Sequence, residues 1–130
     1  MNRVHGSLND QALIYLQIAQ MLEDDILRGV CREEEQVPST NELAREYNIN
    51  PATAVKGINL LVAEGVLYKR RGIGMFVAPG ATAAVKEKRR KALGEEYVLP
   101  LLREAKSLGL NKEELLAMVK EAIEHEGGEK

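Results

Sequence analysis

The fold is decided between Val37 and Val77, where the chain reads VPSTNELAREYNINPATAVKGINLLVAEGVLYKRRGIGMFV. Near its start, Ser39 and Glu42 have the S-x-x-E spacing of a capping box, which satisfies free backbone N–H groups at the beginning of a helix. The apolar residues that follow favour a short helix over about residues 40–47. We therefore expect the module to open with a short capped helix.

A second capped helix is predicted directly after the first. Residues 48–50 read NIN and are typical of a tight turn. Asn50 is a good N-cap, and Pro51 suits the first position of a helix because its missing N–H would have no partner there. The helix should run over about residues 51–64 and end at Gly65.

A basic hairpin follows these two helices. Residues 66–70 and 75–78 read as short strands around the turn Arg71-Gly72-Ile73-Gly74. Basic residues beside a glycine turn let the backbone approach phosphates or a narrow minor groove. Hairpins with charged edges also occur in proteins that bind no nucleic acid. Two capped helices followed at once by such a hairpin, however, predict a winged helix-turn-helix, whose hairpin is the wing.

The second helix of a helix-turn-helix enters the major groove with its N-terminal residues nearest the bases. Ala52, Thr53 and Lys56 are expected on its outward side, where they can contact a thymine methyl, a phosphate or guanine. Each could equally be a cap or surface residue, so the prediction rests on the whole set. The predicted DNA-binding residues are Thr40, Asn41, Arg45, Asn50, Pro51, Ala52, Thr53, Lys56, Lys69, Arg70, Arg71, Gly72 and Ile73.

The flanking segments define the domain organisation. Residues 11–28 have apolar residues at helical spacing and predict a helix that ends at Gly29. Residues 79–84, PGATAA, are typical of a linker. We therefore expect a DNA-binding domain over residues 1–79, followed by a linker and a two-helix region over residues 80–130.

The two-helix region should dimerise. Residues 85–108 predict a long helix that Pro100 should kink, because proline removes one backbone hydrogen bond. A final helix is expected over about residues 112–125. Two amphipathic helices cannot bury both apolar stripes alone, so a two-fold partner would cover the surplus. The predicted dimerisation residues are Leu93, Tyr97, Val98, Leu101, Leu102, Ala105, Leu108, Leu115, Val119, Ala122 and Ile123.

Composition argues against several other classes of protein. The net charge is −2, which disfavours a nonspecific nucleic-acid coat, although basic residues cluster at 69–71 and 86–91. Cys31 is the only cysteine, so no internal disulfide can form and no cysteine pair can hold zinc. His5 and His125 have no other ligand at metal-binding spacing. No catalytic motif is present, so we expect no enzyme activity, no metal and no cofactor.

The sequence predicts a cytoplasmic protein. Residues 1–10 lack the apolar core of a signal peptide. No apolar run approaches the roughly 18 residues of a membrane span, so no membrane partner is expected. No cluster of residues indicates a small-molecule effector, so any effector is unknown.

These motifs resemble the bacterial GntR family of transcriptional regulators, whose DNA-binding domain reads G-x-L-x-x-G-x-x-L-P-S-x-R-E-L-A, then N-x-x-T-V, E-G and G-x-G-T-F-V. The resemblance covers about residues 11–78. Residues 79–130 are too few for most GntR effector domains and look like the YtrA-type branch, which implies dimerisation and regulation of transporter operons. The matching positions are Gly29, Val37-Pro38-Ser39, Glu42-Leu43-Ala44, Asn50, Thr53, Glu64-Gly65 and Gly72-Ile73-Gly74-Met75-Phe76-Val77.

Several positions depart from that pattern. Asn41 stands where the family usually has arginine, whose bidentate guanine contact would be worth roughly 1–3 kcal/mol of discrimination. Glu34 replaces a loop glycine, and Gly57 replaces a common alanine at a cost of about 1 kcal/mol in helix propensity. Ile73 and Met75 replace the usual wing residues. We therefore expect an atypical operator and reduced DNA affinity.

The sequence thus predicts a mainly α-helical protein with a small β-hairpin, built from a winged helix-turn-helix and a C-terminal helical dimerisation hairpin. The expected function is sequence-specific transcriptional regulation, as a repressor that binds an inverted-repeat operator as a homodimer. The alternative is a winged-helix interaction module that has lost useful DNA binding, as the neutral side chains of Asn41, Val55 and Ile73 would allow. The expected partners are double-stranded DNA and a second copy of the chain.

Overall fold

A computed structural model describes residues 10–127 of the chain. His5 and the residues assessed for a signal peptide therefore lie almost entirely outside the described range. The chain divides into two compact units, Met1–Lys88 and Arg89–Lys130. We refer to them as the N-terminal unit and the C-terminal unit and describe each by itself.

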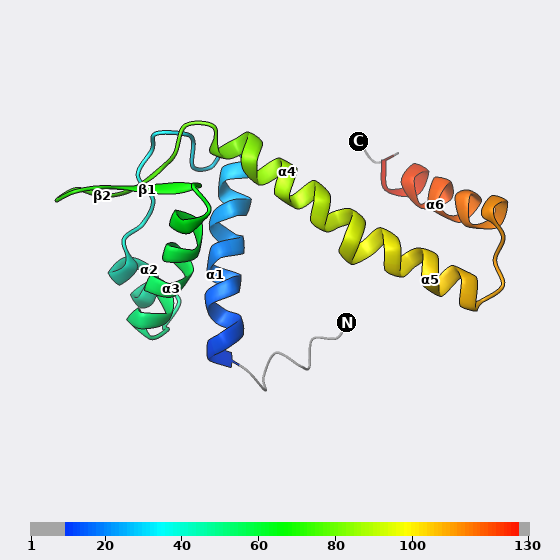
Figure 1. Cartoon of the computed structure of the whole chain (residues 1–130), viewed down its shortest axis with the longest axis horizontal. Coiled ribbons are helices and arrows are strands. Elements are labelled where there is room, and N and C mark those ends of the chain that lie inside the picture. The colour runs from blue at the N-terminus through cyan, green and yellow to red at the C-terminus, as the bar shows by residue number, and fades with distance from the viewer. Residues whose placement is uncertain (1–9, 128–130) are drawn as a thin grey trace. The chain divides into compact units, whose positions relative to one another are not determined.

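The N-terminal unit has the predicted winged helix-turn-helix order, with a hairpin that projects from three helices (Figure 1). The mainly α-helical fold class with a small antiparallel hairpin is confirmed. The elements are α1 Asp10–Leu27, α2 Thr40–Glu46, α3 Pro51–Ala63, β1 Leu67–Arg70 and β2 Gly74–Val77.

The core of this unit is aliphatic, as the composition requires. α3 packs against both α1 and α2. From α1 the apolar stripe supplies Ile18, Leu22 and Ile26, and from α3 it supplies Ile58 and Leu61, all of them buried. Full burial of such a side chain contributes roughly 1.5–3 kcal/mol, so this helical packing holds α3 in place.

α2 begins with the predicted capping box. The Ser39 hydroxyl accepts from the Glu42 N–H at 3.0 Å, and the Glu42 carboxylate accepts from the Ser39 N–H at 2.8 Å. Leu43 and Ala44 are buried. Tyr47 is exposed because it follows the last turn of α2 as its C-cap.

The hairpin pairs Leu67 with Val77 and Arg70 with Gly74 in an antiparallel register. The loop before α2 lies along β2 and is attached to it by backbone hydrogen bonds. The N–H of Val37 donates to the Met75 carbonyl at 2.9 Å, and the N–H of Glu34 donates to the Val77 carbonyl at 2.7 Å. The loop and the wing therefore form one connected structure.

The expected linker at 79–84 is wrong, because helix α4, Ala81–Leu93, starts inside it. Ala81 and Val85 are buried in the hydrophobic core of the N-terminal unit. Burial of these two side chains makes the first turns of α4 part of that core. The N-terminal unit consequently extends to Lys88 rather than ending at 79.

Glu33 caps the start of α4 from a distant loop. Its carboxylate accepts from the backbone N–H of Gly80 at 2.9 Å and from that of Thr82 at 3.2 Å. These hydrogen bonds, with that of Gly80 the stronger, lower the pKa of Glu33. Glu33, which lies in the loop between α1 and α2, thus stabilises the start of α4.

Near Pro100, where the sequence predicted a kink, the helix changes its pattern of hydrogen bonds. The helical chain passes from α4 through a π-helical turn, Gly94–Val98, into α5, Leu99–Ser107. The N–H of Leu99 donates to the carbonyl of Gly94, five residues earlier. Because proline has no N–H and clashes with the preceding turn, the wider π turn accommodates it.

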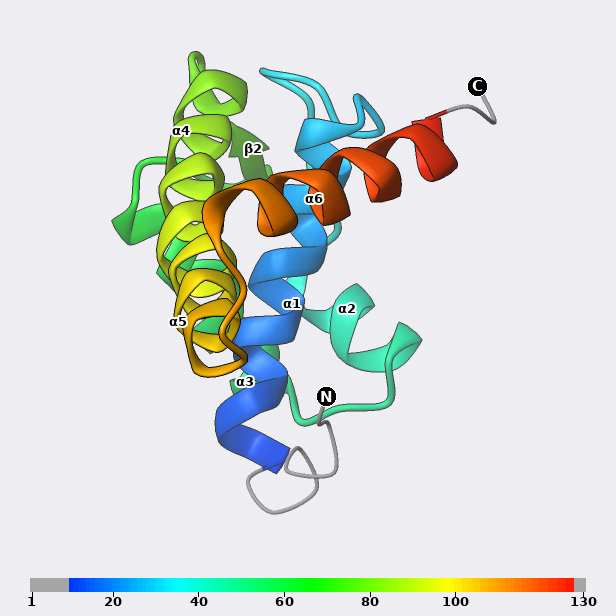
Figure 2. The same ribbon diagram turned by 90° about the vertical axis from the view of Figure 1, so that its right-hand side faces the viewer.

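α6, Lys112–Gly127, follows a turn at Gly109. Asn111 and Glu114 form its capping box, with hydrogen bonds of 2.9 and 2.8 Å. α6 turns back after α5 (Figure 1) and runs at a wide angle to it (Figure 2). The predicted pair of C-terminal helices is therefore present, but the two helices diverge.

Candidate nucleic-acid interface

The N-terminus of α3 has the predicted cap. Asn50 is in an extended conformation, and its Oδ1 accepts from the N–H of Ala52 at 2.8 Å. Pro51 occupies the start of the helix. The cap leaves Pro51 and Ala52 exposed, so a ligand can reach this end of α3.

The exposed side of α3 carries a cation and no carboxylate. Ala52, Val55, Lys56 and Asn59 are exposed, and the helix sequence PATAVKGINLLVA contains no acidic residue. The Lys56 ammonium lies 4.7 Å from the centroid of the Tyr15 ring, a cation–π distance. The Tyr15 ring thus contacts the Lys56 ammonium, while Lys56 stays exposed to solvent.

Thr53 is not on the outward side, and that expectation is wrong. Its side chain is only 6% exposed. α3 packs against both α1 and α2, so its buried arc is wider than a single apolar stripe and includes position 53. The outward face of α3 therefore presents Ala52 and Lys56, without Thr53.

Gly57 has a packing role that its helix propensity conceals. A Cβ at this position would lie 2.9 Å from the backbone oxygen of Tyr15 and 3.1 Å from Cγ2 of Ile18. The absence of a side chain thus lets α1 and α3 approach closely. The departure from alanine is a requirement of this packing and not only a cost to the helix.

α2 contributes polar residues to the surface of the same unit. Asn41 and Arg45 are exposed, and Thr40 is half-buried at the first position of the helix. No ion-pair partner of Arg45 is found in the part of the chain that the structure describes. Arg45 is therefore available to an anionic ligand.

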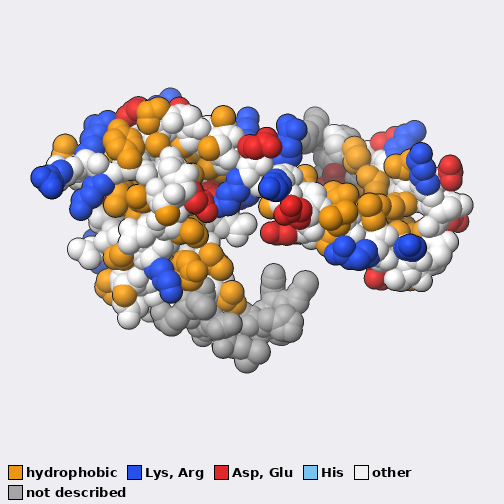
Figure 3. Space-filling view, viewed as in Figure 1, with side chains coloured by type: hydrophobic (Ala, Val, Ile, Leu, Met, Phe, Trp, Pro, Cys, Tyr) orange, Lys and Arg blue, Asp and Glu red, His pale blue; other side chains and the backbone are white. Residues whose placement is uncertain are grey.

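The wing carries the densest group of cations in the unit. Figure 3 shows Lys and Arg side chains gathered at the projecting end of the hairpin. Lys69, Arg71 and Gly72 are exposed, and Gly72 has a φ of 78° that suits glycine. Ile73 is 61% exposed and lies next to them, so the tip is basic with one apolar side chain.

Gln36 anchors the wing tip from the loop. Its Nε2 donates to the carbonyl of Ile73 at 3.0 Å. Gly74 has a φ of 147°, a backbone conformation that residues with a side chain rarely adopt, so this position needs glycine. The turn is thereby tied to the body of the unit at its most distal point.

Arg70 makes several contacts within its own unit. Its Nε and Nη2 donate to the Tyr68 hydroxyl oxygen at 3.1 and 2.8 Å, and Nη2 also donates to the Glu34 carboxylate at 3.0 Å. The guanidinium lies 4.0 Å from the centroid of the Phe76 ring. The hydrogen bonds to Tyr68 and, after it, Glu34 raise the pKa of Arg70.

Sequence reasoning missed the residues that hold the wing. Glu34, Gln36 and Tyr68 were not among the expected site residues, yet each touches the wing or its cations. Glu34 and Gln36 are far from the wing in sequence, and no spacing rule joins them to it. The one available signal was Glu34, which stands where the GntR pattern has glycine.

The C-terminal unit exposes most of its large apolar side chains, and Figure 3 shows them over α5 and α6. Within the described part of this unit, Ala105 is the only apolar residue that is buried. The sequence predicted Ala105 as a dimerisation residue, but its burial leaves it unavailable to a partner. Leu115 and Val119 are half-buried. The exposed large apolar side chains are Leu93, Tyr97, Val98, Leu99, Leu101, Leu102, Leu108, Leu116, Met118 and Ile123.

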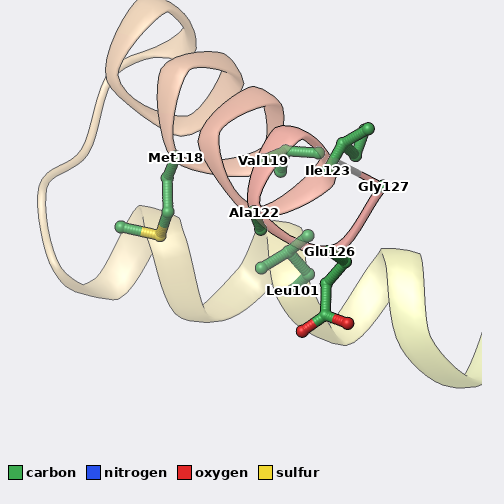
Figure 4. A pocket seen from close by; sticks show the side chains of 7 residues that line it. All are labelled: Leu101, Met118, Val119, Ala122, Ile123, Glu126 and Gly127. Carbon is green, nitrogen blue, oxygen red and sulfur yellow. The ribbon is translucent and has the colours of Figure 1, made fainter. Parts of the chain in front are cut away.

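An apolar groove lies between α5 and α6 (Figure 4). Its volume is about 690 Å³. Leu101 from α5 and Met118 and Ala122 from α6 line the groove, and Glu126 lies at one end of it (Figure 4). Leu99, Leu116 and Met118 extend the apolar surface beyond the residues that periodicity indicated.

Among residues 10–127, no group of histidine, cysteine and acidic side chains could hold a metal ion. None of the described helices combines the length and the apolar character needed to cross a membrane.

Comparisons with known proteins agree with this arrangement. The sequence model of the family described as "Bacterial regulatory proteins, gntR family" matches residues 14–77. The HTH-type transcriptional repressor YtrA of Bacillus subtilis (strain 168) is 30% identical over 118 residues, which cover 90% of this chain and 90% of YtrA. A GntR family transcriptional regulator from Listeria monocytogenes has a similar structure, with a TM-score of 0.71 and 27% identity over 83% of this chain and 93% of that one.

A second group of relatives matches only about half of this chain. The probable fructoselysine utilization operon transcriptional repressor of Escherichia coli (strain K12) is 45% identical over 65 residues, which are 50% of this chain. This chain spans only 27% of the length of that relative. The match to YtrA, in contrast, runs through both units. The family match and this similarity along the whole length show that the chain belongs to the GntR family of bacterial transcriptional regulators.

Proposed function

We propose that this chain is a cytoplasmic, homodimeric repressor that binds an inverted-repeat operator through α3 and the wing. The observation that carries the proposal is the exposed, carboxylate-free face of α3, capped at Asn50, in a unit whose hairpin presents Lys69 and Arg71. Membership of the GntR family supports DNA as the ligand.

The dimensions suit a duplex. α3 has 13 residues and a length of roughly 20 Å at 1.5 Å per residue, so its first turns can enter a major groove about 12 Å wide. Ala52 and Lys56 would then face base edges or phosphates. The wing cations would contact the flanking backbone, where each neutralised phosphate releases counterions.

The C-terminal unit supplies the reason for a dimer. Its described part buries Ala105 and exposes large apolar side chains on both α5 and α6, so it has no adequate core of its own. Large exposed apolar patches are typical of interaction surfaces, which supports an interface here. A second copy that covers it would place two α3 helices on two half-sites, which is the geometry of an inverted repeat.

The proposals that the protein represses transcription and regulates a transporter operon rest on its relatives. YtrA and the fructoselysine relative are both named repressors, which supports repression by occupation of a promoter. The resemblance to the YtrA-type branch supports an operon that encodes a transporter. The alternative of an interaction module is favoured by Val55 and Ile73, which are apolar and exposed on the surface assigned to DNA.

Gel-shift and footprinting assays on the DNA upstream of the chain's own operon test the proposal, at about 50 mM salt because phosphate contacts weaken as salt rises. Lys56→Ala and Arg71→Ala together should abolish the protected half-sites. The matched control is Lys120→Ala, an exposed cation of α6. If the double variant represses its operon as well as the wild-type protein does, the interaction module is the better account.

A further inference from the structure

Glu34 adopts a backbone conformation that a glutamate rarely takes. Its φ is 73°, and among the described residues other than glycine only Asn48 shares a positive φ. Asparagine tolerates this region because its short side chain bonds locally, whereas a longer side chain is strained there. Glycine would fit Glu34's position without strain. A glutamate that keeps this conformation calls for a compensating interaction of its side chain.

The compensating interaction lies at the base of the wing. Oε1 of Glu34 accepts from the Tyr68 hydroxyl at 2.6 Å and from Nη2 of Arg70 at 3.0 Å. The Glu34 N–H donates to the carbonyl of Val77 at 2.7 Å. The residue is thus fixed to β2 by its backbone and to β1 by its carboxylate.

We propose that Glu34 restrains DNA binding by the wing, because its carboxylate occupies Arg70 in an intramolecular ion pair and so competes with a DNA phosphate for that guanidinium. This inference rests on the proposed function. A phosphate makes the same charge-assisted hydrogen bonds to arginine as a carboxylate does. Lys69 and Arg71 have no ion-pair partner among the described residues, so the restraint acts on Arg70 alone.

The geometry favours competition over support. Tyr68 accepts two hydrogen bonds from Arg70, and the Phe76 ring stacks beneath the guanidinium at 4.0 Å. These contacts hold Arg70 in place without Glu34. The side chains of Arg70 and Glu34 are 42% and 49% exposed, so a phosphate can reach the pair and replace the carboxylate.

Removal of the carboxylate should therefore strengthen binding. An exposed ion pair is weak, so removal of the competing Glu34 carboxylate should raise the DNA affinity by about twofold to fivefold for each wing that contacts DNA. Each additional phosphate contact should also make the slope of log K against log salt steeper by about 0.9. An effect of both kinds identifies a new phosphate contact rather than a change in folding.

The experiment measures the affinity of the full chain for its upstream DNA across a series of salt concentrations. Glu34→Gln removes the charge, and Glu34→Gly removes the side chain at a position where glycine is unstrained. Glu35→Gln is the control, because it makes the same charge change on the same loop while Glu35 contacts Arg32. Both substitutions at 34 should be repeated with Arg70→Ala, and the melting temperature of every variant should be recorded.

The expected result is tighter binding and a steeper salt slope for both variants at position 34, no such gain for Glu35→Gln, and loss of the gain in the Arg70→Ala background. Unchanged or weaker binding by both variants overturns the inference. An equal gain from Glu35→Gln also overturns it, because general charge would then explain the effect. If the wild-type protein binds no DNA, the proposed function fails. In that case, DNA binding gained by the Glu34→Gln variant still supports the restraint. A Glu34→Gln variant that gains no DNA binding refutes the restraint.

Discussion

Lys88 offers the most direct test of how α4 is joined to the DNA-binding unit. Its ammonium lies 2.6 Å from a carboxylate oxygen of Glu23 on α1 and 2.9 Å from one of Glu64 at the end of α3. The Glu23 side chain is only 4% exposed. Replacement of Lys88 by methionine keeps the length of the side chain and removes the charge that these two carboxylates share.

The cost follows from the burial of Glu23. Removal of one partner of a fully buried ion pair costs about 3–5 kcal/mol, because the other charge stays buried without compensation. The Lys88 side chain is 45% exposed, so water can take over part of its role. Glu23 also has a further interaction. We therefore expect Lys88→Met to lower the free energy of unfolding by about 1–2 kcal/mol, less than the fully buried case.

The pH dependence has a definite sign. Burial alone would lower the pKa of Lys88, but the hydrogen bonds that it donates to Glu23 and Glu64 outweigh burial and raise it. A raised lysine pKa contributes stability that is complete below the unfolded value of about 10.4 and is lost as the pH rises through the folded value. The difference between wild type and Lys88→Met should thus stay constant through neutral pH and shrink in alkaline solution as Lys88 loses its proton.

Thermal unfolding at one protein concentration measures the effect. For a unit of this size, the expected loss corresponds to a decrease in melting temperature of roughly 5–15 °C. Lys86→Met is the matched control, because it makes the same change at an exposed position of the same helix and should stay within about 0.5 kcal/mol. Equal melting temperatures for the two variants would refute the inference that this ion pair holds α4 to the unit.

Further predictions concern packing and assembly. Gly57→Ala should destabilise the protein by about 1–3 kcal/mol, despite the better helix propensity of alanine, because its Cβ would meet the Tyr15 oxygen at 2.9 Å. At Gly94 an added Cβ would meet no atom of another element within 4 Å, so Gly94→Ala should be neutral or stabilising in thermal unfolding. A larger loss of stability from Gly94→Ala than from Gly57→Ala would contradict this packing. Leu108→Glu, at a side chain that is 65% exposed, should convert a dimer to a monomer in sedimentation velocity. Lys106→Glu, at an exposed charged position in the last turn of α5, should leave the dimer intact. A wild-type monomer at tens of micromolar would remove the proposed interface.

Helix starts and turns could be predicted because their determinants are local. The capping boxes at Ser39 and Asn111 and the Asn50-Pro51 cap each involve hydrogen bonds within three residues. A local interaction leaves its signature in adjacent letters of the sequence. The order of helices, turn and hairpin therefore followed from short motifs, and with it the expected place of the DNA-binding surface.

The errors occurred where a distant element decides the environment. Thr53 is buried because α3 packs against two helices, whereas one stripe suggests a single buried side. Residues 81–84 are helical, although their composition is typical of a linker, because Glu33 caps the helix and the core accepts Ala81 and Val85. Neither the cap nor the core is adjacent in sequence to the segment that it orders.

The sequence by itself determined the capped helices, the glycine turn of the wing, the aliphatic character of the core and the resemblance to GntR regulators. Only the tertiary structure decided which cations of the wing are free. Arg70 pairs with Glu34 across 36 positions of the chain, since the loop before α2 attaches to β2 by backbone hydrogen bonds. Such a contact depends on the docking of two segments, and that docking is a property of the whole packed unit rather than of either segment.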